Sequence, residues 1–137
     1  MGRKKKSADA QPSEFEMQIL GVLWEQGPST VRQVMDLLPD GKPRAYTSVL
    51  SVMQVMQKKG LLTTADKKDG LANVYVPAVQ RSEVVTPLLR GLVSKVFGGS
   101  TRAVVQHLLE DAEIPQDEIS QLRQLLDEVE SRRKSDH

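Results

Sequence analysis

The chain has 137 residues, of which 39% are hydrophobic and only 4% aromatic, with 19 lysine and arginine residues against 18 acidic ones. This length holds one domain or two very small ones, and the scarcity of aromatic side chains favours helices packed through Leu, Val and Met. The sequence has no cysteine, which excludes disulfides and thiolate metal sites and predicts a cytoplasmic protein. No segment approaches the roughly 20 apolar residues of a transmembrane helix.

The charge is uneven along the chain. Residues 1–76 carry 11 basic and 8 acidic side chains, a net +3, whereas residues 77–137 carry 8 and 10, a net −2. This asymmetry favours an N-terminal half that meets a polyanion. Residues 1–12 contain the run Arg3-Lys4-Lys5-Lys6 and are expected to be disordered, either as a solvated tail or as a basic arm that adds phosphate contacts.

Two helices are predicted at the start of the ordered chain. Ser13-Glu14-Phe15-Glu16 is a capping-box pattern that opens the first helix, in which we expect Trp24 to belong to the core. Either Ser29 or Thr30 caps a second helix, which stops before the Pro39–Pro43 segment. That connection is longer than the turn of a tight helix-turn-helix, which favours a winged variant.

The third predicted helix runs from about Arg44 to Lys59, with Gly60 placed to end it. Helical periodicity puts its apolar residues on one face: Val49, Val52, Met53 and Met56. The opposite face is a polar stripe formed by Thr47, Ser51, Gln54 and Lys58, with Arg44 just before it. The stripe contains no acidic residue, so it is suited to lie against phosphates and to hydrogen-bond base edges.

A β-hairpin is predicted after this helix. Leu61–Asp66 and Leu71–Val76 are strand candidates, and the Asp-Gly in the connection between them is a strong hairpin signal. Lys67 and Lys68 at the tip are interpreted as phosphate contacts, although a turn that is simply polar is the alternative. A helix followed by such a hairpin predicts a winged helix that binds DNA.

The remaining chain is predicted to be helical, with helices near residues 82–97, 101–110 and 116–132. Because Pro87 belongs in a first turn, the first of these helices starts at either Ser82 or Thr86. Three short helices cannot hide all their apolar residues in one another, so we expect a dimer, the alternative being packing on the winged domain of the same chain. The residues assigned to the dimer interface are Leu88, Leu92, Val96, Leu122, Leu125, Leu126 and Val129.

The predicted fold is therefore mainly α with a small β-hairpin: a winged helix-turn-helix domain at residues 13–78 and a three-helix dimerisation domain at 79–137. His107 and His137 are the only histidines, and the sequence lacks the nucleophile, phosphate-loop and metal-ligand motifs of common enzymes. We predict that the protein is not an enzyme and that it uses neither a cofactor nor a metal ion.

Five segments in order resemble the penicillinase-repressor family, the BlaI/MecI-type winged-helix regulators, over about residues 13–129. They are LWEQGPSTVRQV (23–34), AYTSVLSVMQVMQKKGLL (45–62), VYVPAV (74–79), VFGGS (96–100) and EISQLRQLLDEV (118–129). The resemblance implies a homodimeric repressor that binds double-stranded DNA at an operator with dyad symmetry. The third helix would enter the major groove and the wing would lie on the DNA backbone.

Residue roles follow from the same resemblance. The residues implied at the groove-facing start of the recognition helix are Arg44, Thr47, Ser48 and Ser51, with Gln54 further along the polar stripe. Those implied to meet phosphates are Lys58, Lys59, Lys67 and Lys68. Residues from about Ser82 onward would form the dimer domain.

The resemblance also implies a partner and shows two departures. In family systems with a membrane-bound sensor metalloprotease, the repressor is cleaved in the helix after the Gly-Gly break, and this chain has Gln106-His107 where the antibiotic-resistance repressors have Asn-Phe. Val55 stands where many relatives carry an arginine. Val55 and the low net charge leave open a winged-helix protein-interaction module without specific DNA binding; a small-molecule sensor is a third alternative.

Overall fold

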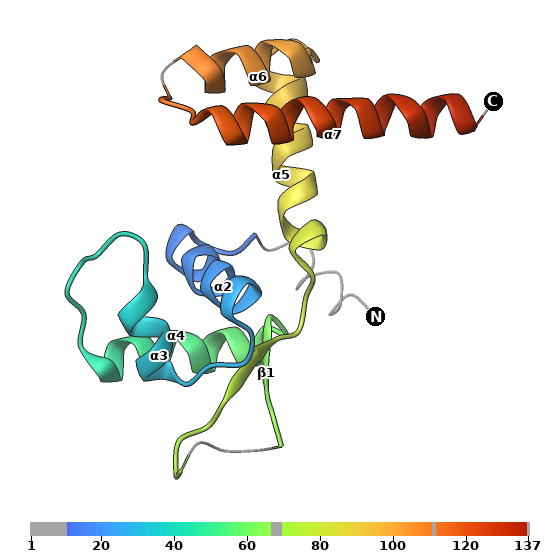
Figure 1. Cartoon of the computed structure of the whole chain (residues 1–137). Helices are drawn as coiled ribbons and strands as arrows, with labels where there is room; N and C mark the ends of the chain where they lie inside the picture. Colours follow the sequence, from blue (N-terminus) through green and yellow to red (C-terminus); the bar gives the residue numbers. More distant parts are fainter. Residues whose placement is uncertain (1–10, 67–69, 111, 137) are drawn as a thin grey trace. The chain divides into compact units, whose positions relative to one another are not determined.

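The computed structural model describes residues 11–66, 70–110 and 112–136. The chain forms two compact units that divide between Leu89 and Arg90 (Figure 1). The predicted domain boundary at residues 78 and 79 stays a prediction.

Helix α2 (Glu14–Gln26) begins at the predicted capping box. The Ser13 hydroxyl accepts a hydrogen bond from the Glu16 amide at 3.1 Å, and the Glu16 carboxylate accepts one from the Ser13 amide at 2.9 Å. Two amides at the helix start that have no partner within the helix are thereby satisfied. The helix ends at Gly27, whose φ of +85° is a conformation that glycine adopts without steric cost.

Helix α3 (Val31–Leu37) is capped by Thr30, which decides between the two predicted caps. Thr30 and Gln33 form a second capping box, with hydrogen bonds of 3.2 and 2.8 Å. Ser29 instead pairs with the hairpin, because its backbone amide donates to the Tyr75 carbonyl and its carbonyl accepts from the Tyr75 amide.

Helix α4 (Tyr46–Lys58) is slightly shorter than predicted. It ends at Gly60, with φ +85°, in a Schellman motif. The Leu61 amide donates to the Met56 carbonyl at 2.9 Å, and the Gly60 amide donates to the Gln57 carbonyl at 3.1 Å. The chain thus leaves the helix in a fixed direction and enters the first strand.

The hairpin consists of strands β1 (Leu62–Thr64) and β2 (Tyr75–Pro77), which pair antiparallel in the register Leu62 with Pro77 and Thr64 with Tyr75. Both strands are shorter than predicted, and Pro77, expected to follow its strand, is its last residue. Proline is tolerated there because it lies at the end of an edge strand. Tyr75 is buried between Thr64 and Ser29, whereas the neighbouring Val74 and Val76 are only half-buried.

The core of the first unit lies where α2, α3, α4 and the hairpin meet. Its buried residues are Ile19, Leu20, Val22, Leu23, Val31, Val34, Val49, Met53, Met56, Leu61, Leu62 and Tyr75. Trp24 packs against this cluster, as predicted, and its indole nitrogen donates to the Val79 carbonyl at 3.0 Å. This bond anchors the segment that leaves the hairpin.

Helix α5 (Arg81–Val96) begins before both predicted starts. The Glu83 carboxylate accepts a hydrogen bond from the Gln80 amide at 2.7 Å, which caps the helix at this point. Pro87 therefore lies inside the helix and not in its first turn. The preference of proline for the first turn did not predict this start, because the helix begins at the cap between Gln80 and Glu83.

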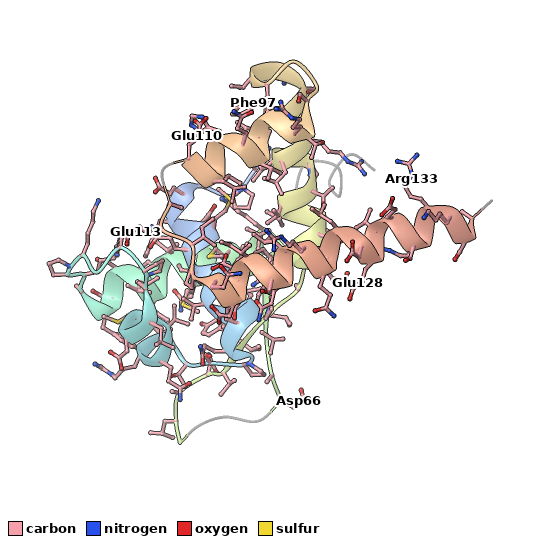
Figure 2. The ribbon with its side chains drawn as sticks, turned by 45° about the horizontal axis from the view of Figure 1, so that its top comes forward. Asp66, Phe97, Glu110, Glu113, Glu128 and Arg133 are labelled. Atoms are coloured by element: carbon pink, nitrogen blue, oxygen red, sulfur yellow. The ribbon has the colours of Figure 1, made fainter. Side chains whose placement is uncertain are left out.

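Helices α6 (Thr101–Glu110) and α7 (Gln116–Ser135) lie side by side in the second unit (Figure 1). Ser100 caps α6 as predicted, because its hydroxyl accepts from the Ala103 amide at 3.0 Å. Helix α7 continues three residues beyond the predicted Arg132. Glu128 and Arg133 extend away from its ribbon (Figure 2).

This arrangement confirms the predicted mainly α fold with a small β-hairpin. Helices α3 and α4 followed by β1 and β2 have the order of a winged helix-turn-helix. The part that follows the hairpin is helical, as predicted.

Candidate nucleic-acid interface

The polar stripe of α4 faces away from the core. Thr47, Ser51, Gln54 and Lys58 are all exposed, as is Ser48 beside them. The opposite face is anchored by Val49, Met53 and Met56, each with none of its surface exposed. Because these three side chains fix the rotation of the helix about its axis, burial in the core determines that the stripe faces outward.

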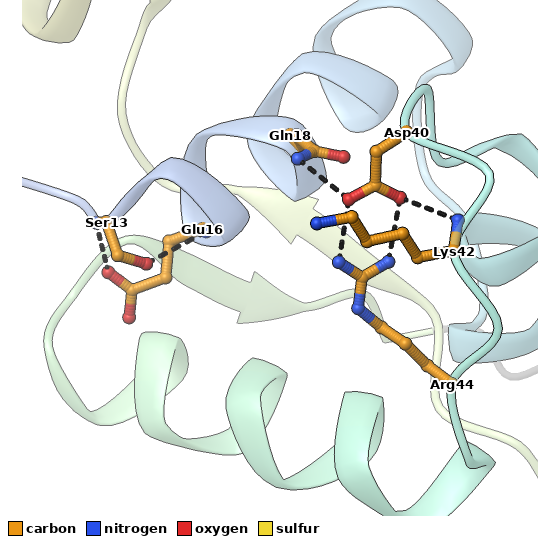
Figure 3. Close-up of polar contacts among 6 residues, drawn as sticks. All are labelled: Ser13, Glu16, Gln18, Asp40, Lys42 and Arg44. Carbon is orange, nitrogen blue, oxygen red and sulfur yellow. Dashed lines mark hydrogen bonds and ion pairs between the residues drawn. The ribbon is translucent and has the colours of Figure 1, made fainter.

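Arg44, predicted to lie at the groove-facing start of α4, is engaged within its own domain. Its two terminal nitrogens donate to the two carboxylate oxygens of Asp40 at 2.9 and 2.7 Å (Figure 3). Its guanidinium carbon lies 4.1 Å from the centre of the Phe15 ring. The bond from Arg44 and the bonds from Lys42 and Gln18 hold the pKa of Asp40 well below its usual range, and the bond to Asp40 raises the pKa of Arg44.

Lys59, predicted to meet a phosphate, also has an acidic partner. Its ammonium group lies 2.8 Å from a carboxylate oxygen of Glu16, which is only 5% exposed. Burial raises the pKa of Glu16, but the hydrogen bond from Lys59, the bonds from Ser13 and the lysine charge together outweigh it. The pKa of this carboxyl group therefore lies below its ordinary value, and Glu16 is ionised at neutral pH.

These pairs involve residues that the sequence did not single out as functional. Asp40 stands four positions before Arg44, but both lie in the non-helical connection before α4, where this spacing does not by itself bring two side chains together. Glu16 lies 43 positions before Lys59, so no local pattern could have found it. The sequence also did not predict the contact between Arg32 of α3 and the exposed Tyr46 of α4. The guanidinium carbon of Arg32 lies 5.1 Å from the centre of the Tyr46 ring.

Val55 remains 47% exposed on α4, beside the polar stripe. It borders a shallow hollow of about 260 Å³ between the start of α2 and the middle of α4. The hollow is lined by Ser13, Phe15, Glu16, Ser51, Val52 and Val55. Val55 thus lines this hollow with nearly half of its surface exposed and is not part of the core.

The wing is only partly described. Lys67 and Lys68, predicted to contact phosphates, lie outside the described residues. Leu71, predicted to begin the second strand, lies four residues before β2 and is 98% exposed. Its position in the wing was predicted, but its complete exposure was not.

The second unit presents a large apolar surface. No described residue of α5, α6 or α7 is buried in the single chain. Of the residues assigned to the dimer interface, Leu88 lies in the first unit and is half-buried, whereas the six in the second unit are exposed: Leu92, Val96, Leu122, Leu125, Leu126 and Val129. An apolar groove of about 570 Å³ runs between α6 and α7, lined by Val105, Leu109, Ala112, Ile114, Ile119, Leu122, Arg123, Leu125 and Leu126.

Gln106 and His107, the residues at the implied cleavage bond, are exposed in the middle of α6. The Gln106 amide donates to the Glu110 carboxylate at 3.3 Å, and the His107 ring meets the Phe97 ring edge-on at 5.8 Å between centres. Cleavage at this bond would require local unfolding of the helix.

Two other features are absent from the part of the chain that the structure describes. Residues 11–66, 70–110 and 112–136 contain no group of three His, Cys, Asp or Glu side chains that could hold a metal ion. None of the helices described there is long and apolar enough to cross a membrane.

Comparison with known proteins identifies the family. The family model described as penicillinase repressor matches residues 12–128. The transcriptional regulator BlaI of Mycobacterium tuberculosis (strain ATCC 25618 / H37Rv) is 33% identical over 120 residues, covering 86% of this chain and 84% of that protein. The penicillinase repressor of Bacillus licheniformis is 23% identical over 124 residues, covering 90% of this chain and 95% of that protein.

A solved structure resembles the chain less closely. It is a homodimeric winged helix-turn-helix DNA-binding domain from Mycobacterium bovis, with a TM-score of 0.48 and 17% identity, covering 74% of this chain and 84% of that one. The family-model match spans both the winged unit and most of the second unit. The chain therefore belongs to the penicillinase repressor family, a family of repressors rather than enzymes, as its sequence predicted.

Proposed function

We propose that the protein is a homodimeric transcriptional repressor that binds a dyad-symmetric operator, with α4 in the major groove and the wing on the DNA backbone. The observation that carries this proposal is the acid-free polar stripe of α4, exposed on a helix whose opposite face is locked into the core. Family membership supports the same function, because the matching relatives are named as regulators and repressors.

The chemistry of the stripe suits base edges. Hydroxyl groups of Thr47 and Ser51 both donate and accept hydrogen bonds, and the Gln54 amide can pair with adenine through two bonds. Lys58 lies at the end of α4, where an ammonium group meets a phosphate without needing a particular base. The stripe thus combines groups that read sequence with one that contributes affinity.

The apolar surface of the second unit supports the homodimer. Six of the seven predicted interface residues are exposed in the single chain, and large exposed apolar patches mark interaction sites. A two-fold dimer would cover the surface and would also place two α4 helices on successive half-sites of an operator.

Electrophoretic mobility shift with DNA from upstream of its own gene tests the proposal. We expect salt-dependent binding to one dyad sequence and weaker binding to the same DNA with the dyad scrambled. Binding that does not distinguish the two DNAs at any salt concentration would contradict specific repression. That result would instead favour the protein-interaction module that Val55 and the net charge of +1 suggest.

Two substitutions in the stripe separate its roles. Lys58→Ala should weaken binding to operator and scrambled DNA alike and lower the slope of log K against log salt by about 0.9. Gln54→Ala should cost about 1–3 kcal/mol on the operator only. Lys134→Ala, at an exposed lysine near the end of α7, is the control and should change neither. An unchanged salt slope in Lys58→Ala would remove its phosphate role.

We also infer that a membrane-bound sensor metalloprotease releases repression by cleaving the repressor, which would act in the cytoplasm. The exposed Gln106-His107 bond lies within α6, so its cleavage would separate the end of α6 and all of α7, which carry most of the exposed large apolar residues of the second unit, from the winged unit. Mass spectrometry of the protein recovered from cells with and without a β-lactam should reveal a fragment that ends at Gln106. An intact chain in derepressed cells would contradict this route.

A further inference from the structure

Helix α4 lacks a start signal of its own. Its N-cap residue is Ala45, whose side chain has no acceptor for the free amides, and the first turn contains no acidic residue. The connection before it, from Leu38 to Ala45, includes two prolines and Gly41 with φ +64°. The first turn of α4 nevertheless holds Thr47 and Ser48, which are expected to meet base edges, so its position must be determined by contacts outside the helix.

The carboxylate of Asp40 supplies these contacts (Figure 3). One oxygen accepts from Arg44 at 2.9 Å and from the Lys42 amide at 3.0 Å; the other accepts from Arg44 at 2.7 Å and from the Gln18 amide nitrogen at 3.2 Å. Four donors match the four acceptor positions of a carboxylate. Asp40 thus joins α2, the connection and the residue immediately before Ala45.

Arg44 is held on a second side by α2. The 4.1 Å approach of its guanidinium carbon to the Phe15 ring centre is a cation–π contact, and its side chain is 21% exposed. The guanidinium group is therefore both paired with a carboxylate and placed over an aromatic ring. A DNA phosphate could bind this group with the same geometry only by displacing the Asp40 carboxylate.

We propose that Asp40 and Arg44 are positioning residues for DNA recognition, which hold the first turn of α4 against α2 and do not themselves contact DNA. This inference rests on the proposed function, and it gives Arg44 a different role from the groove contact that the family resemblance implies. The first turn then presents Thr47 and Ser48 in one orientation, as groups in a recognition site require.

The substitution Asp40→Asn distinguishes a positioning role from a purely electrostatic effect of the carboxylate, because the two predict opposite changes in affinity for the operator. Removing a negative charge near DNA should tighten binding to any sequence if only the overall field matters. A positioning role predicts the opposite on the operator: affinity falls about tenfold, the effect of losing one charge-assisted hydrogen bond, while binding to scrambled DNA is not weakened. Asp36→Asn, at an exposed carboxylate of α3, removes the same charge and should not weaken operator binding.

A double substitution tests whether Arg44 acts through Asp40. In the Asp40→Asn background, a positioning role predicts that Arg44→Gln costs less than a further twofold and leaves the salt slope unchanged. A direct phosphate contact predicts a further loss of affinity and a slope lower by about 0.9. The second result would overturn the positioning role of Arg44.

Hydrogen exchange provides a readout that does not depend on DNA. We expect Asp40→Asn to accelerate exchange of the Ser48 and Val49 amides, which donate to the Ala45 carbonyl in the first turn of α4, at least tenfold. Exchange around Met53 should be unchanged, which also shows that the variant is folded. Unchanged exchange in the first turn, or operator binding equal to that of Asp36→Asn, would overturn the inference. Failure of the unsubstituted protein to bind any dyad would overturn the proposed function instead, and the exchange result would still test the contact.

Discussion

Leu126 offers a direct test of the proposed dimer. It lies on α7 with 67% of its surface exposed in the single chain, at the border of the apolar groove between α6 and α7. If a second copy covers this surface, Leu126→Ala removes apolar contact from the interface. Because the side chain is largely exposed in the single chain, truncating it should change the folding of one copy very little.

The expected loss of dimer stability follows from the exposed fraction of Leu126. Full burial of a leucine side chain contributes roughly 1.5–3 kcal/mol, so covering the exposed part of Leu126 contributes about 1–2 kcal/mol in each copy. A two-fold interface contains the residue twice. We therefore expect the dimer to lose about 2–4 kcal/mol, which raises its dissociation constant about 30- to 700-fold.

Sedimentation equilibrium over a range of protein concentrations measures this constant. Leu71→Ala is the matched control, because it makes the same substitution at a residue that is 98% exposed in the wing and outside the second unit. It should leave the dissociation constant unchanged. If Leu126→Ala leaves the dissociation constant within threefold of the unsubstituted value, the assignment of Leu126 to a dimer interface is refuted. If the chain is always monomeric and Leu126→Ala lowers its melting temperature, the helices of the second unit pack on their own winged domain instead.

Three further outcomes are expected. Thr30→Ala removes the cap of α3, so it should lower the free energy of unfolding by about 1 kcal/mol, measured as a lower urea midpoint with an unchanged slope. An unchanged midpoint would mean that the Gln33 backbone amide finds another acceptor. Folding lowers the pKa values of Glu16 and Asp40, so their contribution to the free energy of unfolding is complete above the unfolded pKa values near 4 and is lost as the pH falls through the folded values. Urea titrations at decreasing pH should show this loss of stability, and Glu16→Gln should make the dependence of stability on pH shallower. Deleting residues 2–10, which carry the run Arg3 to Lys6, should reduce the salt slope of DNA binding by up to about 3–4 if the arm contacts phosphates, and an equal slope would leave it a solvated tail.

Much of the winged unit follows from local patterns. The Ser13 capping box, the glycine after α4 and the polar stripe were all predicted, because each depends on residues within a few positions of one another. Of the two starts predicted for α5, Ser82 lies one residue from the observed Arg81, whereas Thr86, which Pro87 suggested, is wrong because the Glu83 carboxylate caps the helix at Gln80. The strands came out too long, because apolar alternation does not reveal where pairing stops.

The sequence by itself determined the kind of fold, the family, and which face of α4 is polar, since composition and periodicity encode burial and family resemblance requires no coordinates. Only the tertiary structure decided which partners the charged residues around that face have within the folded chain. Arg44 and Lys59 were both expected to contact DNA, yet each is paired with a carboxylate, and Phe15 and Glu16 of α2 meet them only after the chain has folded. Whether a cation is available to a phosphate depends on neighbours brought together across as many as 43 positions, and no local pattern encodes such a contact.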